Sequence, residues 1–172
     1  QGLVLSRYYL DQNGNRLEGQ GTISGEVYIR NSMGYLIEKK QVNVEGRTCD
    51  FKDHHASIRF GYDQWGNSVK VSYYSSTDQP ILSKGGYAFK TLKYDDEGNL
   101  SRVAYFGGDG EPMLGSNGYA SWTQTYSQDL MITSTFDRQG QLTLSSYGYA
   151  IKRSIYDEYG NIMEQSYWDI QN

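Results

Sequence analysis

Apolar side chains alternate with other residues along short stretches of this chain, as they do in β-strands. Ala56, Ile58, Phe60 and Tyr62 fall on one face of a clear stretch, and residues 88–94 repeat the alternation. No stretch shows the three- and four-residue steps of an amphipathic helix. Neither face of the stretches is cleanly polar, which favours a stacked or wrapped sheet over a single layer with one wet side. The pattern therefore predicts an all-β protein.

Turn-forming residues separate these stretches. Residues 88–94 are followed by Asp95-Asp96-Glu97-Gly98. Aspartate side chains bind nearby backbone N–H groups, and glycine accepts a positive φ. A second extended run occupies 99–106, so the segment predicts an antiparallel β-hairpin. We expect residues 111–114 to add a short third strand.

The hairpin pattern recurs about every 32 residues. Three sequence features recur at a constant spacing from one another. They are Tyr-Asp-x-x-Gly-Asn, a Gly-Tyr-Ala segment before it, and an aromatic pair with a turn after it. With one degenerate copy, the first tyrosines of the motif are spaced by 32, 32 and 30 residues: Tyr62, Tyr94, Tyr126 and Tyr156. Tandem repeats bury their apolar faces against their neighbours. We predict a single β-repeat domain over 1–172, degenerate at 1–53 and clear at 54–168.

The N-terminal region contains a degenerate copy of the repeat, Tyr8-Tyr9-Leu10-Asp11-Gln12-Asn13-Gly14-Asn15. Residues 30–34 lie one period before Tyr62 and keep little of the motif. Asp11, Asn13 and Asn15 mimic the start of a calcium loop, but Thr22 stands where an EF-hand needs glutamate. Turn geometry is the favoured explanation of these residues.

Composition narrows the classes of protein. The 172 residues include 16 basic and 20 acidic side chains, giving a net charge of −4, so we expect no nucleic-acid partner. The 17 tyrosines raise the aromatic content to 15%, which argues against a disordered chain. A single cysteine excludes a disulfide framework. No run approaches the ~20 apolar residues of a membrane helix, so we expect no membrane insertion.

Motifs for catalysis are absent from the sequence. There is no GxSxG, HExxH or Walker loop, and paired carboxylates such as Asp95-Asp96 lie in recurring turns. We therefore predict a non-catalytic protein that needs no cofactor.

One cluster of residues raises the question of a metal site. His54 and His55 lie beside other potential ligands, namely Cys49, Asp50 and Asp53. Adjacent histidines on a strand point to opposite faces, and His55 fills the tyrosine position of the repeat. Packing is therefore favoured over metal binding, and we predict no metal.

Aromatic residues at the repeat spacing are the remaining candidates for ligand binding. Exposed rings stack on sugars or anchor partner proteins, whereas buried rings pair across strands. Trp65 and Tyr159 occupy turns, where we expect exposure. Strict alternation places Tyr87 and Tyr149 on the face opposite their neighbouring alanines. The candidate ligand-binding residues are Trp65, Tyr87, Tyr119, Trp122, Tyr149 and Tyr159.

The phased series resembles the YD repeats of bacterial Rhs-type proteins and animal teneurins. The resemblance covers residues 54–168 and rests on segments such as Tyr94-Asp95-Asp96-Glu97-Gly98-Asn99, Tyr105-Phe106 and Gly118-Tyr119-Ala120. It implies hairpins that wind into a long sheet, which in Rhs proteins forms a shell around a toxin. Residues 8–15 are also similar to the aromatic–glycine repeats of choline- and glucan-binding modules.

These observations predict a bacterial β-repeat module with a structural or adhesive role, extracellular or at the cell surface. The chain begins at Gln1 without a leader pattern, so we expect a processed form or a piece of a longer protein. Terminal strands offer a route to self-association into fibres. The alternative is a carbohydrate-binding module that uses the repeated aromatic residues. Its partner would be a polysaccharide, whereas an adhesive module would also bind a surface protein.

Overall fold

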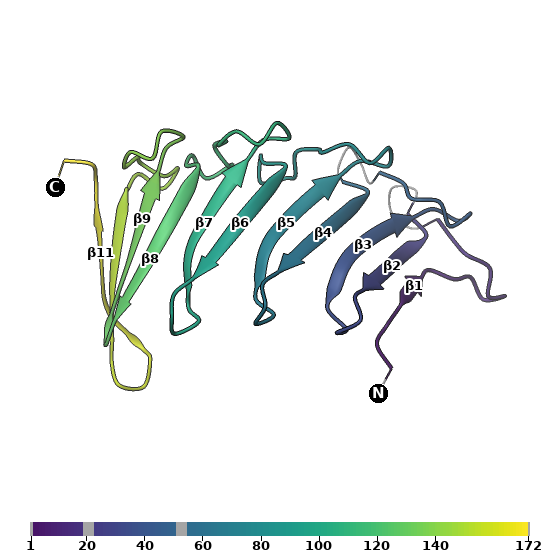
Figure 1. Ribbon diagram of the computed structural model, residues 1–172, viewed down its shortest axis with the longest axis horizontal. Coiled ribbons are helices and arrows are strands. Elements are labelled where there is room, and N and C mark those ends of the chain that lie inside the picture. The colour runs from purple at the N-terminus through teal and green to yellow at the C-terminus, as the bar shows by residue number, and fades with distance from the viewer. Residues whose placement is uncertain (1, 19–22, 51–54, 172) are drawn as a thin grey trace. The chain divides into compact units, whose positions relative to one another are not determined.

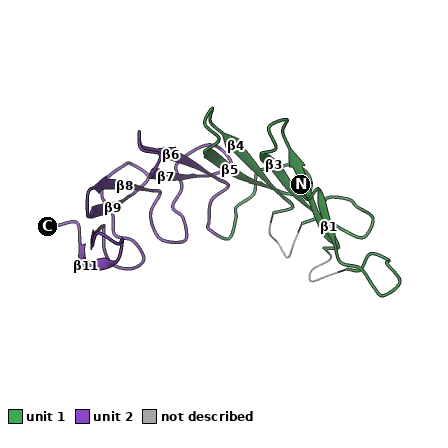
Figure 2. Ribbon diagram, turned by 90° about the horizontal axis from the view of Figure 1, so that it is seen from below, with its two compact units in different colours: residues 1–84 green, residues 85–172 purple. Residues whose placement is uncertain are grey.

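The regular structure of the described residues is entirely β (Figure 1). A computed structural model describes residues 2–18, 23–50 and 55–171, which hold eleven strands and no helix. No described segment could therefore cross a membrane as a helix. The chain divides into two compact units, residues 1–84 and 85–172 (Figure 2). The predicted all-β fold of antiparallel hairpins is confirmed, whereas a single domain over 1–172 stays a prediction.

Each unit is an antiparallel meander in which consecutive strands pair. Unit 1 contains β1 (Ser6–Tyr8), β2 (Gly25–Arg30), β3 (Leu36–Val42), β4 (Ser57–Tyr62) and β5 (Ser68–Tyr74). Unit 2 contains β6 (Phe89–Tyr94), β7 (Leu100–Phe106), β8 (Ser121–Ser127), β9 (Leu130–Phe136), β10 (Ile151–Tyr156) and β11 (Ile162–Trp168). Even-numbered strands from β2 onward begin a hairpin and the following odd-numbered strands end it. Longer connections then lead to the next hairpin.

The Tyr-Asp-x-x-Gly-Asn motif builds one kind of hairpin turn. Between β4 and β5, Asp63 N donates to Asn67 O at 3.0 Å and Gly66 N donates to Asp63 O at 3.2 Å. Gly66 has a φ of 89°, as a type I turn with a glycine bulge requires. Asp63 Oδ1 accepts from the N–H groups of Trp65 and Asn67 at 3.0 and 2.9 Å. The aspartate and glycine of the motif are therefore explained by turn geometry.

The same turn occurs at residues 30–34, where the sequence retains little of the motif. Asn31 Oδ1 accepts from Met33 N at 3.1 Å and from Tyr35 N at 2.9 Å, as Asp63 does in its own turn. Gly34 takes a φ of 86°. An asparagine thus replaces the aspartate without loss of the turn, and the array is more regular in structure than in sequence.

A second turn follows each hairpin from β2–β3 to β8–β9. In unit 2, Phe106 and Pro112 then form an isolated bridge. The predicted third strand at 111–114 is therefore wrong, because proline has no N–H for a ladder and another turn begins at Gly115. The degenerate copy at residues 8–15 also forms a turn of this second kind, which is closed by the bridge between Leu10 and Arg16.

Small side chains occupy the positions where these connections fold back on the strands. In Figure 2 the long connections of each unit lie mainly to one side of its strands. The alanine of each Gly-Tyr-Ala segment is buried, as is its counterpart in unit 1: Ala88, Ala120, Ala150 and Ala56. We infer that close packing explains the recurring alanine, because protein interiors leave little free space around a buried side chain.

Candidate functional site

Tyrosine rings stack on one face of the unit 2 sheet. Tyr105 of β7 lies opposite Lys90 of β6, so both side chains share a face. Its ring lies 4.5 Å from that of Tyr87 and 6.0 Å from that of Tyr119, measured between centroids. We call Tyr87, Tyr105 and Tyr119 the central tyrosine stack. Burial of this half-buried ring raises the pKa of Tyr105 to about 12.

The central stack corrects the prediction from alternation. Tyr87 and Tyr149 were expected on the face opposite their neighbouring alanines. Instead Tyr87 stacks on Tyr105 and Tyr149 packs against Tyr167 in a tilted arrangement. Tyr105 and Tyr167 lie opposite Lys90 and Lys152 on the alanine face. Alternation fails here because each of these tyrosines ends a turn and does not belong to a strand.

A second group of rings lines an open hollow beside β11. Tyr149 lies 4.8 Å from Tyr167 and 6.2 Å from Tyr147 between ring centroids. The hollow has a volume of about 660 Å³. That volume lies in the range of small-molecule sites. Tyr147 is 72% exposed and Tyr167 is 48% exposed. We call this site the β11 hollow; its lining is Tyr147, Gly148, Tyr149, Tyr167, Trp168 and Asp169.

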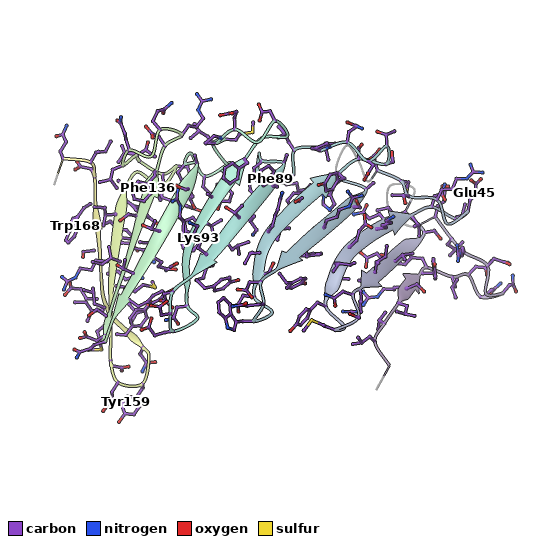
Figure 3. All side chains as sticks on the ribbon, in the orientation of Figure 1. Glu45, Phe89, Lys93, Phe136, Tyr159 and Trp168 are labelled. Carbon is purple, nitrogen blue, oxygen red and sulfur yellow. The ribbon has the colours of Figure 1, made fainter. Side chains whose placement is uncertain are left out.

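The six predicted contact residues occupy different environments. Tyr87 and Tyr119 flank Tyr105, and half-buried Trp122 lies close by on β8. Tyr149 lines the β11 hollow. Trp65 and Tyr159 lie at hairpin turns of units 1 and 2, where they are 75% and 80% exposed, as predicted. Tyr159 projects from the tip of the β10–β11 hairpin, while Trp168 lies at the other end of β11 (Figure 3).

Several aromatic rings that form the central tyrosine stack and the β11 hollow were not among the predicted site residues. Tyr105 lies at the centre of the central tyrosine stack, Tyr167 packs against Tyr149, and Tyr147 is the most exposed ring of the hollow. The signal was present in the sequence, since Tyr105 and Tyr167 are the first members of the recurring aromatic pairs. Their role depends on which strand face the preceding Gly-Tyr-Ala turn covers.

The potential metal ligands serve other contacts. His55 packs on Tyr73, with ring centroids 5.1 Å apart, and Asp50 accepts from Ser76 N at 2.9 Å. His54 and Asp53 lie outside the described residues. Burial raises the pKa of the Cys49 thiol, which disfavours a reactive thiolate. The described part of the chain has no group of three His, Cys, Asp or Glu residues placed to hold a metal.

The calcium-like segment is a turn of the repeat. Asp11 Oδ1 accepts from the backbone N–H groups of Asn13 and Asn15 at 2.8 Å each. Asp11 Oδ2 accepts from Asn15 Nδ2 at 3.0 Å. These bonds, led by the one from the Asn15 side chain, lower the pKa of Asp11. The carboxylate is therefore engaged by its own loop.

No family model and no curated protein sequence matches this chain.

Proposed function

We propose that this chain is a non-catalytic β-repeat module with a structural or adhesive role at a bacterial surface. One observation carries the proposal: within unit 2, the connecting loops bind one another in a ladder. Ser116 N donates to Gly85 O at 2.8 Å, and Ser146 N donates to Asn117 O at 2.8 Å one repeat further on. The same kind of contact joins successive repeats, as expected of a scaffold that extends by repetition.

The strands and rings support the same conclusion. Tyr105 N donates to Ala120 O at 2.8 Å, and Thr135 N donates to Ala150 O at 2.9 Å, so each hairpin is bound to the next by an equivalent bond. The central tyrosine stack also spans two repeats. The carboxylates of Asp63 and Asp11 accept hydrogen bonds from their own turns. Rigid repetition is the property that a surface scaffold needs.

Inserting one more repeat tests this proposal. We expect a chain with a second copy of residues 121–150, placed between Ala150 and Ile151, to fold and to unfold at a higher urea concentration. The added repeat brings its own strand bonds, loop bond and buried alanine, and each further interface adds to stability in a repeat array. Circular dichroism during urea titration measures the midpoint.

The control is an insert of the same composition in scrambled order, which we expect to lower the midpoint. An authentic insert that unfolds the chain, or that lowers stability as the scrambled one does, contradicts the scaffold proposal.

A carbohydrate-binding role is the second candidate, favoured by the aromatic walls of the β11 hollow. Stacking of a sugar on Tyr147 would change the environment of neighbouring Trp168. Under this alternative, titration with maltoheptaose changes tryptophan fluorescence, and Tyr147→Ala removes the response whereas Tyr159→Ala keeps it. Unchanged tryptophan fluorescence up to millimolar maltoheptaose counts against binding of this glucan.

A further inference from the structure

We infer that β11 and its hollow bind an extended polypeptide that carries the repeat's own pattern. The pattern is a Gly-Tyr-Ala turn followed by a strand with arginine at its third position. This inference rests on the proposed scaffold function and names the partner that such a scaffold accepts. Four features of the described structure support it: the strand edge, the loop, the rings and the charge.

The edge of β11 has the geometry of a strand that receives a partner. In the described sheet β11 pairs with β10 and is last in the strand order. Strands β7 and β9 hold the same place in their hairpins, and each pairs with the first strand of the next hairpin. Tyr167 of β11 is the counterpart of Tyr105, whose N–H binds Ala120 O. An added strand would extend this ladder.

The β11 hollow lies where the next loop would lie. A Cβ on Gly118 would be 3.4 Å from Ser146 N, so the loop of the following repeat lies directly against Gly118. Gly148 is the equivalent glycine beside the hollow, and nothing lies within 4 Å of the same point. Tyr147 corresponds in turn to Asn117, whose carbonyl accepts from Ser146 N. The space therefore matches the backbone that leads into a Gly-Tyr-Ala turn, as residues 144–146 do beside Gly118.

The tyrosine rings also indicate a position beside β11 that a following repeat would fill. Tyr105 lies between two rings, with Tyr87 on one side and Tyr119 on the other. Tyr167 has Tyr149 on one side, and it lines the hollow with 48% of its surface exposed. The tyrosine of an added Gly-Tyr-Ala turn would occupy the position that Tyr119 has beside Tyr105.

The negative charge of Glu164 favours a basic side chain at the third position of the incoming strand. In unit 1, Glu38 of β3 lies opposite Arg59 of β4 and binds its Nε at 3.0 Å. Glu164 has the same position on β11: each glutamate lies opposite the isoleucine before its hairpin bulge, Ile29 or Ile155. Glu164 is exposed. An arginine on the incoming strand would meet it as Arg59 meets Glu38.

A peptide of residues 145–156 is the probe, because it combines the Gly-Tyr-Ala turn with a strand whose third residue is Arg153. We expect the fluorescently labelled peptide to bind the full chain, with binding measured by anisotropy. We also expect the amide resonance of Tyr167 to shift. Replacement of exposed Glu164 by arginine should weaken binding about fivefold, because it removes one exposed ion pair and adds repulsion.

The decisive control is a charge swap. A peptide with Arg153→Glu should bind the Glu164→Arg chain better than it binds the native chain. Glu158→Arg, at the hairpin turn, makes the same charge change away from the edge and should leave affinity unaltered.

With the peptide probes, the inference is overturned by no binding at millimolar peptide, by equal binding of a scrambled peptide, or by no rescue in the charge swap. Maltoheptaose that binds the hollow and is not displaced by the peptide also overturns it, since the hollow is then a sugar site. Failure here leaves the repeat-insertion result standing, whereas failure of the inserted chain to fold contradicts the scaffold proposal itself.

Discussion

Replacement of Tyr105 by alanine is expected to lower the free energy of unfolding by about 2 to 3 kcal/mol. Removing a fully buried large aromatic ring costs about 3–5 kcal/mol, and Tyr105 is half-buried, so its cost should be at or below the bottom of that range. The loss comes from two ring contacts, since Tyr105 packs against both Tyr87 and Tyr119. Urea unfolding followed by circular dichroism measures the change.

The matched control removes the same side chain from an exposed turn. Tyr159 is 80% exposed, so Tyr159→Ala should change stability by less than about 0.5 kcal/mol. Equal effects of the two substitutions would show that the central tyrosine stack contributes nothing to holding neighbouring repeats together.

Ala150→Leu is expected to destabilise the chain by about 1–3 kcal/mol or more, the usual cost of overpacking. Ala150 is 0% exposed. Its N donates to Trp168 O at 2.9 Å and its O accepts from Thr135 N at 2.9 Å. Neither strand can move away from a larger side chain without losing one of these bonds. Thermal and urea unfolding of the purified variant measure the loss.

Ala104→Leu provides the comparison, because it adds the same atoms on the opposite sheet face. Ala104 lies beside a hollow of about 260 Å³ that can receive the longer side chain. We expect the free energy of unfolding of the Ala104→Leu variant to stay near that of the native chain. A tolerated leucine at 150 would contradict the conclusion that the alanine of Gly-Tyr-Ala is fixed by close packing.

The sequence was sufficient to predict the hairpins, because their turns depend on local chemistry. Asp63 and Gly66 satisfy the turn within five residues, and the exposure of Trp65 follows from its place in that turn. The alternation in β4 likewise predicts its two faces, since Ile58 and Phe60 lie opposite Tyr73 and Val71.

The candidate site was harder to predict because it depends on contacts between repeats. Tyr149 could be assigned to a face only once its turn was known to fold back over the sheet. Tyr167 gains its role from Tyr149, which precedes it by a whole hairpin. The equivalence of Glu164 and Glu38 required the strand register, because the two hairpins share few residues. Asn31 was missed because an amide oxygen replaces the carboxylate of the motif.

Hydrogen exchange at the loop ladder tests most directly whether each repeat is bound to the next. The amide of Ser146 belongs to an exposed residue, yet it donates to Asn117 O across two repeats at 2.8 Å. We predict that this amide exchanges as slowly as the amide of Tyr105, which lies within the sheet and binds Ala120 O. Exchange of the Ser146 amide at the rate of a free peptide group would contradict the scaffold account.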